Sequence, residues 1–456
     1  MKTKTKILAV TLVLLCGSAL APLFPLSAQE PLTLSLKDCV VRATEKNINV
    51  VQSALDQEKS QYKIEEARSV LLPQVEINGT FQDNIKLPVT MLPGDILGQP
   101  GTLLPVSMGT QYNTSAAITA NQVLYNQTVL TSLKLAKKAE YVSTLGVEKA
   151  KEEIAKEVGK LYFLIQTSAE QIQLLKGNIE RTERITDIVK KQVDNGIGKR
   201  VDYDRIMVSL QNLQTQLDNN RALYDQQVNM MKYMLEIPFD RSIQLTDGVD
   251  MSLISLQPWG NADFSDHINI QLLEAQKEVA SLNQKAVNAG YMPSLSFFAQ
   301  YGYQGMRNDF SDYFNSSAMN KWYATSYIGL RLNIPVFDGF QKRSKSRQAR
   351  TDFTKAKLAL ENTKERFSVD FENALNNYVN NKTTVERQEN NIALAQSTYQ
   401  ETALKYREGM ATMSELLQDE IGLSNAQSGY LNALYKFKEA ELEIMSLNGE
   451  IRDLVK

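Results

Sequence analysis

The sequence predicts a mainly α-helical protein with a smaller β portion, built from two copies of one unit: helix, β-hairpin, long helix and returning helix. Three observations predict this fold class. The same motifs recur in the same order about 212 to 220 residues apart. Two heptad stretches without proline each run for about 68 residues. Four segments of about ten residues alternate between apolar and polar side chains, as two-faced strands do.

Composition excludes several classes of function. The 456 residues include 50 Lys and Arg against 52 Asp and Glu, so there is no basic excess for a nucleic-acid partner. His267 is the only histidine, which argues against a His-ligated metal centre and against Ser/His or Cys/His catalysis. We therefore expect no enzyme, no cofactor, no metal ion and no nucleic-acid partner.

The first 28 residues have the pattern of a signal peptide. Three lysines precede the apolar run 7–15, and small residues lead to a cleavage site after Ala28. Lipidation of Cys16 is an alternative, although a bulky leucine precedes it. The mature chain would keep 47 basic and 52 acidic residues and a single cysteine, Cys39. It contains no apolar run of about 18 residues, so we expect a periplasmic, secreted or β-type membrane protein.

The rest of the chain divides into two repeats, 29–260 and 261–456. The motifs that match between them are Asn47–Val50 with His267–Ile270, Pro73 with Pro293, Asn121–Asn126 with Asn333–Asp338, and Gly196 with Gly409. Each repeat should open with one helix, at about 35–71 and 264–291, that ends near its proline because the residue before proline disfavours helix.

Two strands should follow in each repeat, at about 74–86 and 111–124 and at about 294–304 and 323–336. Their alternating apolar positions include Val75, Ile77, Phe81, Ala116, Ile118, Ala120, Leu295, Phe297, Ala299, Tyr301, Ile328, Leu330 and Leu332. This period fits lipid-facing barrel strands, and it fits equally well a hairpin with one face on a protein core. We expect the proline- and glycine-rich connection 87–110 to be an irregular loop, and 304–322 to be a shorter one.

Long helices should follow at about 127–194 and 340–407, with returning helices at about 201–236 and 413–448. A helix of about 68 residues is about 100 Å long. A heptad pattern sustained over that length indicates coiled-coil packing. We expect the returning helices to pack antiparallel against the lower part of the long helices, and the opening helices to pack beside the upper part.

The segment Asn333–Gly339 (NIPVFDG) ends a strand and opens a long helix. Together with Asp38–Val51, the Pro73 junction and the two glycine turns, it resembles the TolC-type outer-membrane efflux protein family. The resemblance covers the chain from Leu32 to about Gly449. The first-copy equivalent, Val123–Asn126, lacks the proline and glycine of the motif.

The resemblance implies a homotrimer in which three chains share a 12-stranded outer-membrane β-barrel, continuous with a periplasmic α-helical coiled-coil barrel. It implies a passive exit duct, in contact with outer-membrane lipid, that docks on a periplasmic adaptor and an inner-membrane transporter to export small molecules or drugs. Independent support comes from strand number, because four strands cannot close a barrel and lipid does not tolerate open edges. The outer-membrane component of a type I protein secretion system and a periplasmic coiled-coil scaffold without a pore are alternatives. The substrate is not encoded in this chain, because the transporter would select it.

The resemblance also suggests residues of a periplasmic gate at the turns Gly196 and Gly409. Glu415 matches an acidic position that rings the opening, and Tyr406 matches a tyrosine that helps to hold the closed state. Asp202 matches Glu415 by the internal repeat. The second acidic position of the family is Gln418 here, with Asp419 next to it, so the sequence does not decide between one and two acidic rings. The basic partner that the family has two residues after the glycine is Ala411 here, so the link to Tyr406 is missing or rebuilt.

Four other features of the sequence could have functional roles. Met230, Met231 and Met234 could form a soft-metal site, but core packing is the simpler interpretation. We expect His267 to be a capping or surface group and Cys39 to pack as a small apolar residue. The basic run 342–350 could meet lipid phosphates or form a solvated face.

Overall fold

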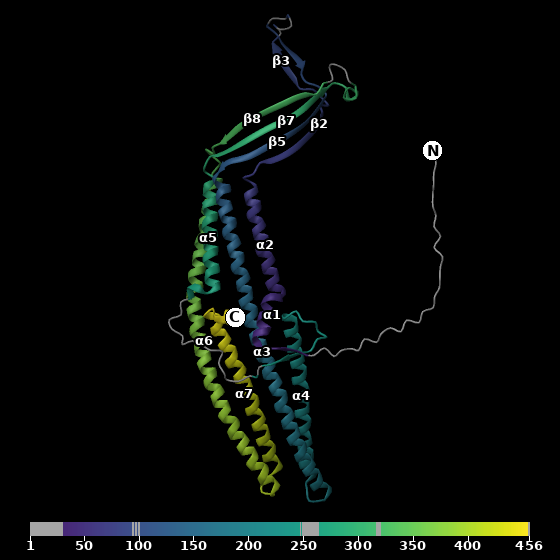
Figure 1. The fold of residues 1–456 in the computed structure, drawn as a ribbon, viewed down its shortest axis with the longest axis vertical. Coiled ribbons are helices and arrows are strands. Elements are labelled where there is room, and N and C mark those ends of the chain that lie inside the picture. Colours follow the sequence, from purple (N-terminus) through teal and green to yellow (C-terminus); the bar gives the residue numbers. More distant parts are fainter. Residues whose placement is uncertain are drawn as a thin grey trace, which may run out of the picture.

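The computed structural model describes residues 31–454 except 94, 96–97, 99–100, 247, 249–263 and 316–320. The expected cleavage site and Cys16 lie outside the described residues. The molecule is elongated, with a curved sheet at one end and long helices that run away from it (Figure 1). The predicted fold class, mainly α with a β portion, is confirmed. No helix among the described residues combines the length and apolar character that crossing a membrane requires.

One four-stranded antiparallel sheet contains both hairpins, in the order β2-β5-β7-β8. Its strands are β2 (Gln74–Asp83), β5 (Tyr112–Asn126), β7 (Ser294–Arg307) and β8 (Tyr323–Asn333). The two repeats join where β5 pairs with β7, so β2 and β8 are both open edges. β8 ends at Asn333, two residues before Pro335, because proline has no N–H to continue the ladder.

The strand register separates apolar from polar side chains on the two faces of this sheet. One row across the four strands reads Val75, Ala120, Ala299 and Ile328. The next row, on the opposite face, reads Glu76, Thr119, Gln300 and Tyr327. On the polar face the Tyr327 hydroxyl donates to Gln300 Oε1 at 2.5 Å. The sheet therefore has one mainly apolar face, interrupted by Thr114, Gln122 and Ser326, and one mainly polar face, on which Phe298 is the large apolar exception.

The prediction of an irregular loop at 87–110 was wrong. Strands β3 (Val89–Pro93) and β4 (Leu103–Ser107) pair as an antiparallel arm above the sheet (Figure 1). Both prolines in it are tolerated because a two-stranded arm has only edge strands. In the second connection, β7 extends to Arg307 and a short helix, η3 (Phe310–Tyr313), follows.

The prediction of one continuous opening helix per repeat was also wrong. The first copy has α1 (Leu36–Lys46) and α2 (Ile48–Ser69), and the second has η2 (Phe264–Asp266) and α5 (Ile268–Ala289). Asn47 and His267 occupy the matching break, where each side chain accepts a hydrogen bond from the backbone N–H two residues on, at 3.0 and 3.1 Å. The cap predicted for His267 is confirmed, but the side chain is buried rather than on the surface.

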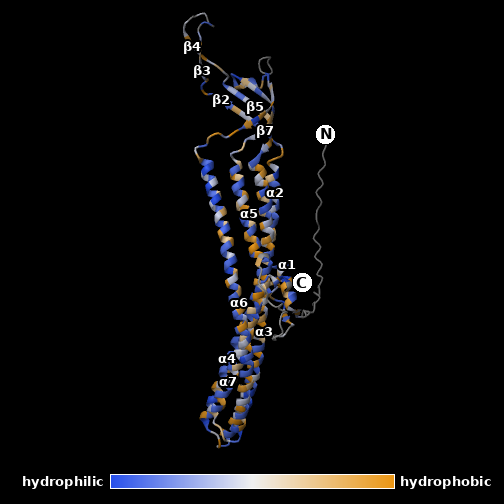
Figure 2. Ribbon diagram, turned by 90° about the vertical axis from the view of Figure 1, so that its left-hand side faces the viewer, coloured by the Kyte–Doolittle hydropathy of each residue, from blue (hydrophilic) through white to orange (hydrophobic). Residues whose placement is uncertain are grey.

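The long helices are α3 (Gln127–Asp194) and α6 (Gln341–Arg407), and the returning helices are α4 (Arg200–Met234) and α7 (Met413–Leu447). Figure 2 shows them as one slender bundle below the sheet. Near the sheet α2 and α5 pack on the long helices, and farther away α4 and α7 take their place. This is the packing that the heptads predicted.

A belt around the middle of α3 holds the largest apolar cluster. It includes α1, the parallel pair β1 (Leu32–Leu34) and β6 (Ile243–Leu245), and the final short helix η4 (Glu450–Leu454). Cys39 is buried in it, as predicted. Met231 and Met234 are buried there too, whereas Met230 is 53% exposed, so the three thioethers share no site.

Candidate functional site at the helix turns

The two helix turns lie side by side at the end of the molecule farthest from the sheet (Figure 1). Gly196 and Gly409 have φ values of 74° and 75°, a region that favours glycine. In both turns the N–H two residues after the glycine donates back to the helix, from Gly198 to the Gln192 carbonyl at 2.9 Å and from Ala411 to the Lys405 carbonyl at 3.2 Å. The turns of the two repeats are therefore closely similar in backbone.

An apolar cluster behind the turns joins all four helices. Its buried members are Val189 of α3, Ile206 of α4, Tyr399 of α6, and Met413, Leu416 and Leu423 of α7. Because each helix contributes to the same cluster, movement of one turn would disturb the packing of the other.

Tyr406 and Asp202, two of the residues that the sequence singled out, come together at the edge of this cluster. Burial raises the pKa of the Tyr406 hydroxyl, and the nearby Asp202 carboxylate raises it further. Since Tyr406 belongs to α6 and Asp202 to α4, this electrostatic influence acts between the second repeat and the first.

Arg205 is a basic residue that contacts both turns. Its Nη1 lies 3.5 Å from Asp202 Oδ1 and donates to Ser414 Oγ of α7 at 3.1 Å. The guanidinium thus connects the first turn of α4 to the first turn of α7. The sequence analysis did not assign Arg205 this role, because the contact depends on how the two turns are placed.

Glu415 lies in the first turn of α7 and forms a capping box with Thr412. Its Oε2 accepts from the Thr412 N–H at 2.7 Å and the Thr412 hydroxyl at 2.9 Å. Hydrogen bonds from the backbone and side chain of Thr412 hold the pKa of the exposed Glu415 carboxyl below its ordinary value. The Thr-x-x-Glu spacing could have revealed this role from the sequence. Glu415 is an ionised, exposed carboxylate whose position is fixed by its own helix.

A buried polar layer above the turns was not predicted. Glu420 of α7 is 3% exposed; its Oε1 accepts a hydrogen bond from the Thr182 hydroxyl of α3. Its other oxygen has no hydrogen-bond partner among the described residues. Burial raises the pKa of Glu420, although Thr182 and Arg181 oppose that shift. The interruption of the apolar heptad stripe at Thr182 is the one feature of the sequence that could have predicted this buried polar layer.

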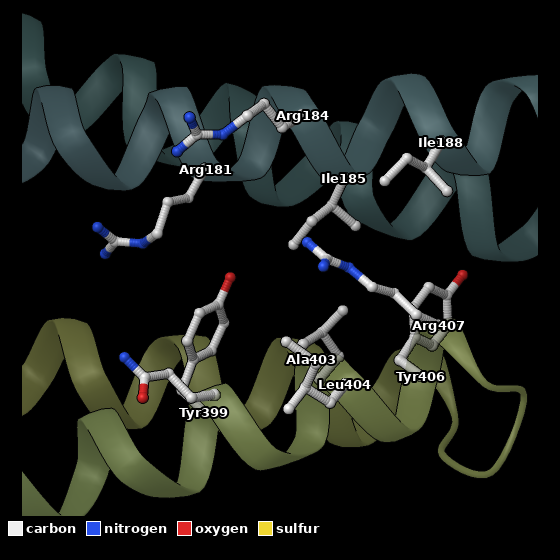
Figure 3. A pocket seen from close by; sticks show the side chains of 11 residues that line it. Arg181, Arg184, Ile185, Ile188, Tyr399, Ala403, Leu404, Tyr406 and Arg407 are labelled. Atoms are coloured by element: carbon white, nitrogen blue, oxygen red, sulfur yellow. The ribbon is translucent and has the colours of Figure 1, made fainter.

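A cavity of about 420 Å³ lies between α3 and α6 beside this layer. Figure 3 shows Arg407 reaching from the end of α6 toward Ile185, and the Tyr399 hydroxyl pointing toward α3. Arg181 and Arg184 also line it, although the Arg184 guanidinium points away from the opening and pairs with Glu180 of the same helix (Figure 3). Within the described ranges, no three His, Cys, Asp or Glu side chains are grouped so that they could hold a metal ion. The site can attract ions, but it contains no catalytic constellation.

The family model described as outer membrane efflux protein matches residues 39–235 and 266–450. The chain is 21% identical to outer membrane protein TolC of Escherichia coli (strain K12), over 97% of this chain and 87% of that protein. A CusC crystal structure, from a study of folding and transmembrane channel formation, superposes with a TM-score of 0.75 at 16% identity, over 91% of each chain. The open state of the Neisseria gonorrhoeae MtrE outer membrane channel gives 0.73 at 17% identity, over 91% of this chain and 88% of that one.

Proposed function

The chain belongs to the outer membrane efflux protein family, and we propose that three copies assemble into the passive exit duct of a tripartite efflux system. The protein lies in the outer membrane, extends into the periplasm and is a channel rather than an enzyme. In the proposed assembly the sheets form the part of the duct within the membrane. The helices carry it toward the inner membrane.

The sheet is the single observation that best supports this proposal. Its apolar face suits lipid, its polar face suits a water-filled lumen, and both of its edge strands are unpaired. Because an open edge is not tolerated in lipid, β8 of one copy must pair with β2 of the next. Three copies supply twelve strands, enough for a barrel with an aqueous interior.

We place the gate at the two helix turns. Three Glu415 carboxylates around a three-fold axis would repel one another and attract cations. The contacts of Arg205 with Asp202 and Ser414 hold the two turns together within each copy and so favour a narrow opening.

A groove of about 660 Å³ between α4 and α7, close to the turns, supports docking of a periplasmic adaptor. It is lined by apolar and polar side chains of both repeats, among them Val208, Leu213, Leu417 and Ile421. A helical hairpin could lay its apolar side chains along such a groove. In this assembly an inner-membrane transporter would supply the energy and select the small molecules or drugs that pass.

Channel recordings test the duct and its gate. Wild-type protein in planar bilayers should give discrete conductance steps that divalent cations block from the side of the turns. Glu415→Gln keeps a side-chain acceptor for the Thr412 cap but removes the charge, so block should weaken while folding is preserved. Asp194→Gln, at the end of α3, is a charge-matched control. Unchanged conductance and block in Glu415→Gln would remove this residue from the lumen.

A matched pair of lysine substitutions tests the membrane sheet. Ile77 is 78% exposed on the apolar face, and Asn78 is the next residue on the polar face. Ile77→Lys should impair insertion, because a lysine facing lipid costs about 2–4 kcal/mol near the bilayer midplane. Asn78→Lys should insert normally. Equal insertion of both variants, measured by heat-modifiable migration of outer-membrane fractions, would contradict the orientation of the sheet.

A further inference from the structure

Basic residues are concentrated in the helical turns directly below the sheet. Residues 59–69 of α2 hold three, 127–138 of α3 three, 280–291 of α5 one and 341–350 of α6 five, and the only acids in these segments are Glu65 and Glu66. The whole chain has 50 basic and 52 acidic residues, so this excess is local.

The opposite end of the sheet has no such excess. The two connections there, 83–112 and 307–323, contain three basic and four acidic residues. The sheet is therefore bordered by positive charge only on the side where the helices begin.

An exposed apolar and aromatic edge lies between β8 and the basic part of α6. Val336 is 92% exposed, Phe337 76% and Phe340 60%. The rings of Phe337 and Phe340 contact each other edge to face, with centroids 5.5 Å apart. Aromatic side chains followed by cationic ones are typical of a membrane–water interface.

Three arginines of α6 form one exposed stripe below this edge. Arg343, Arg347 and Arg350 follow the i, i+4, i+7 spacing of one helix face. Within the described part of the chain no ion pair involves any of them, whereas Lys342 is paired with Asp338 at 3.7 Å. The stripe extends about 10 Å along the helix, comparable to the thickness of a headgroup layer.

Most of the stripe lies between the two flanks of α6. Ala349 and Leu360 are buried on the side that packs on α5. The opposite side, which would meet the next copy, carries Ser344, Thr351 and Leu358. At about 100° per residue Arg343 and Arg350 lie between these two sides and stay accessible in a closed ring of helices, whereas Arg347 lies beside Leu358 at the edge of the second side.

We propose that Arg343, Arg347 and Arg350 bind the phosphates of anionic phospholipid headgroups in the periplasm-facing leaflet, and that Phe337 and Phe340 insert beside them. The inference rests on the proposed membrane position of the sheet. Guanidinium forks pair with two phosphate oxygens at once, so arginines fit this ligand better than lysines. The bound lipid fixes the position of the duct along the membrane normal, with the junction of the sheet and the helices at the membrane surface.

The test compares lipid retention by full-length protein in nanodiscs of phosphatidylcholine with one-fifth phosphatidylglycerol. Native mass spectrometry of the released protein should show phosphatidylglycerol enriched over phosphatidylcholine. In the triple variant Arg343→Gln, Arg347→Gln, Arg350→Gln, the enrichment of phosphatidylglycerol over phosphatidylcholine should fall about ten-fold. The matched control Arg366→Gln, Lys382→Gln, Arg387→Gln removes three charges from the same helix more than about 20 Å below and should retain the enrichment. Size-exclusion profiles and circular dichroism verify that both variants are folded.

Three outcomes would overturn the inference: unchanged enrichment in the triple variant, an equal loss in the control, or a change in channel ion selectivity without a change in lipid, which would place the stripe in the lumen. Failure of the proposed function is separable from these. A wild-type preparation that forms no conducting trimer contradicts the duct, whereas a conducting trimer without lipid preference contradicts only lipid binding at this stripe.

Discussion

The two long helices, α3 and α6, have almost the same length and heptad pattern but very different surroundings. α3 has 68 residues and α6 has 67, yet twenty residues of α3 are buried and only eight of α6. α3 lies in the middle of the layer, between α2 and α5 near the sheet and between α4 and α7 near the turns. α6 contacts α5 and α7 and then ends the layer.

This difference indicates where a second copy must pack. Leu358, Val369 and Leu394 of α6 are 58%, 59% and 69% exposed. α6 continues from β8, one open edge of the sheet, while α2 leads into β2, the other. The unsatisfied strand edge and the unburied helix therefore occupy the same side of the molecule, as the proposed trimeric closure requires.

The largest expected effect comes from charging this side of α6. The double variant Leu358→Asp, Val369→Asp should abolish the trimer, because each carboxylate would be buried without a partner. Light scattering in detergent should report monomers whose helical content by circular dichroism is unchanged. Ile197→Asp, at an 80% exposed position in the first turn, is the control and should leave the trimer intact. A double variant that remains trimeric would show that this side of α6 is not buried against another copy.

Truncation of a leucine should affect the two helices differently. Leu175 of α3 is 1% exposed, so Leu175→Ala should lower the free energy of unfolding by about 2–5 kcal/mol. Leu394→Ala in α6 should change the stability of the single chain by less than about 0.5 kcal/mol. Thermal melts of both truncations, made in the monomeric Leu358→Asp, Val369→Asp background, provide the measurement. Similar losses in both variants would mean that α6 is packed as fully as α3.

Glu420, the buried carboxyl of α7 that contacts α3, should make the stability of the folded chain depend on pH. Because burial raises its pKa in the folded chain, the folded state binds more protons than the unfolded state once pH exceeds the unfolded pKa. Stability should therefore fall as pH rises through the folded pKa. Glu420→Gln should remove this decline and stabilise the protein at neutral pH by about 1–3 kcal/mol. Melting temperatures would be measured from pH 4 to 8. If they depend on pH in the same way for wild type and variant, Glu420 is not the cause of the decline.

Alanine at either turn glycine should have the smallest and most similar effects. Gly196 and Gly409 have nearly equal positive φ, so each substitution should cost about 1–2 kcal/mol. Hydrogen exchange at the first turns of α4 and α7 should accelerate in both variants. A cost at only one turn would show that the turns differ in strain despite their similar hydrogen bonds.

Regular features of the structure were predictable because they repeat along the chain. The heptads of 127–194 predicted α3, and the alternation of Val75, Ile77 and Phe81 predicted a two-faced strand. The breaks at Asn47 and His267 were not found, because a single capping residue leaves the apolar period intact. The arm β3–β4 was missed because prolines and glycines outweighed its short alternating segments.

At the turns, the sequence indicated Gly196, Gly409 and Tyr406 through local pattern and family resemblance. It did not show that Glu415 caps its own helix, although the signal was present at Thr412. The roles of Arg205 and Glu420 could not be predicted, because each contacts a residue more than 200 positions away in the chain.

The two repeats, their main strands and their long helices could be predicted from the sequence, since each follows from periodicity over neighbouring residues. The single sheet with two open edges, and the central and outer positions of the equivalent helices α3 and α6, became evident from the fold alone. Periodicity specifies which face of an element is apolar, whereas the partner that covers this face depends on how distant segments pack.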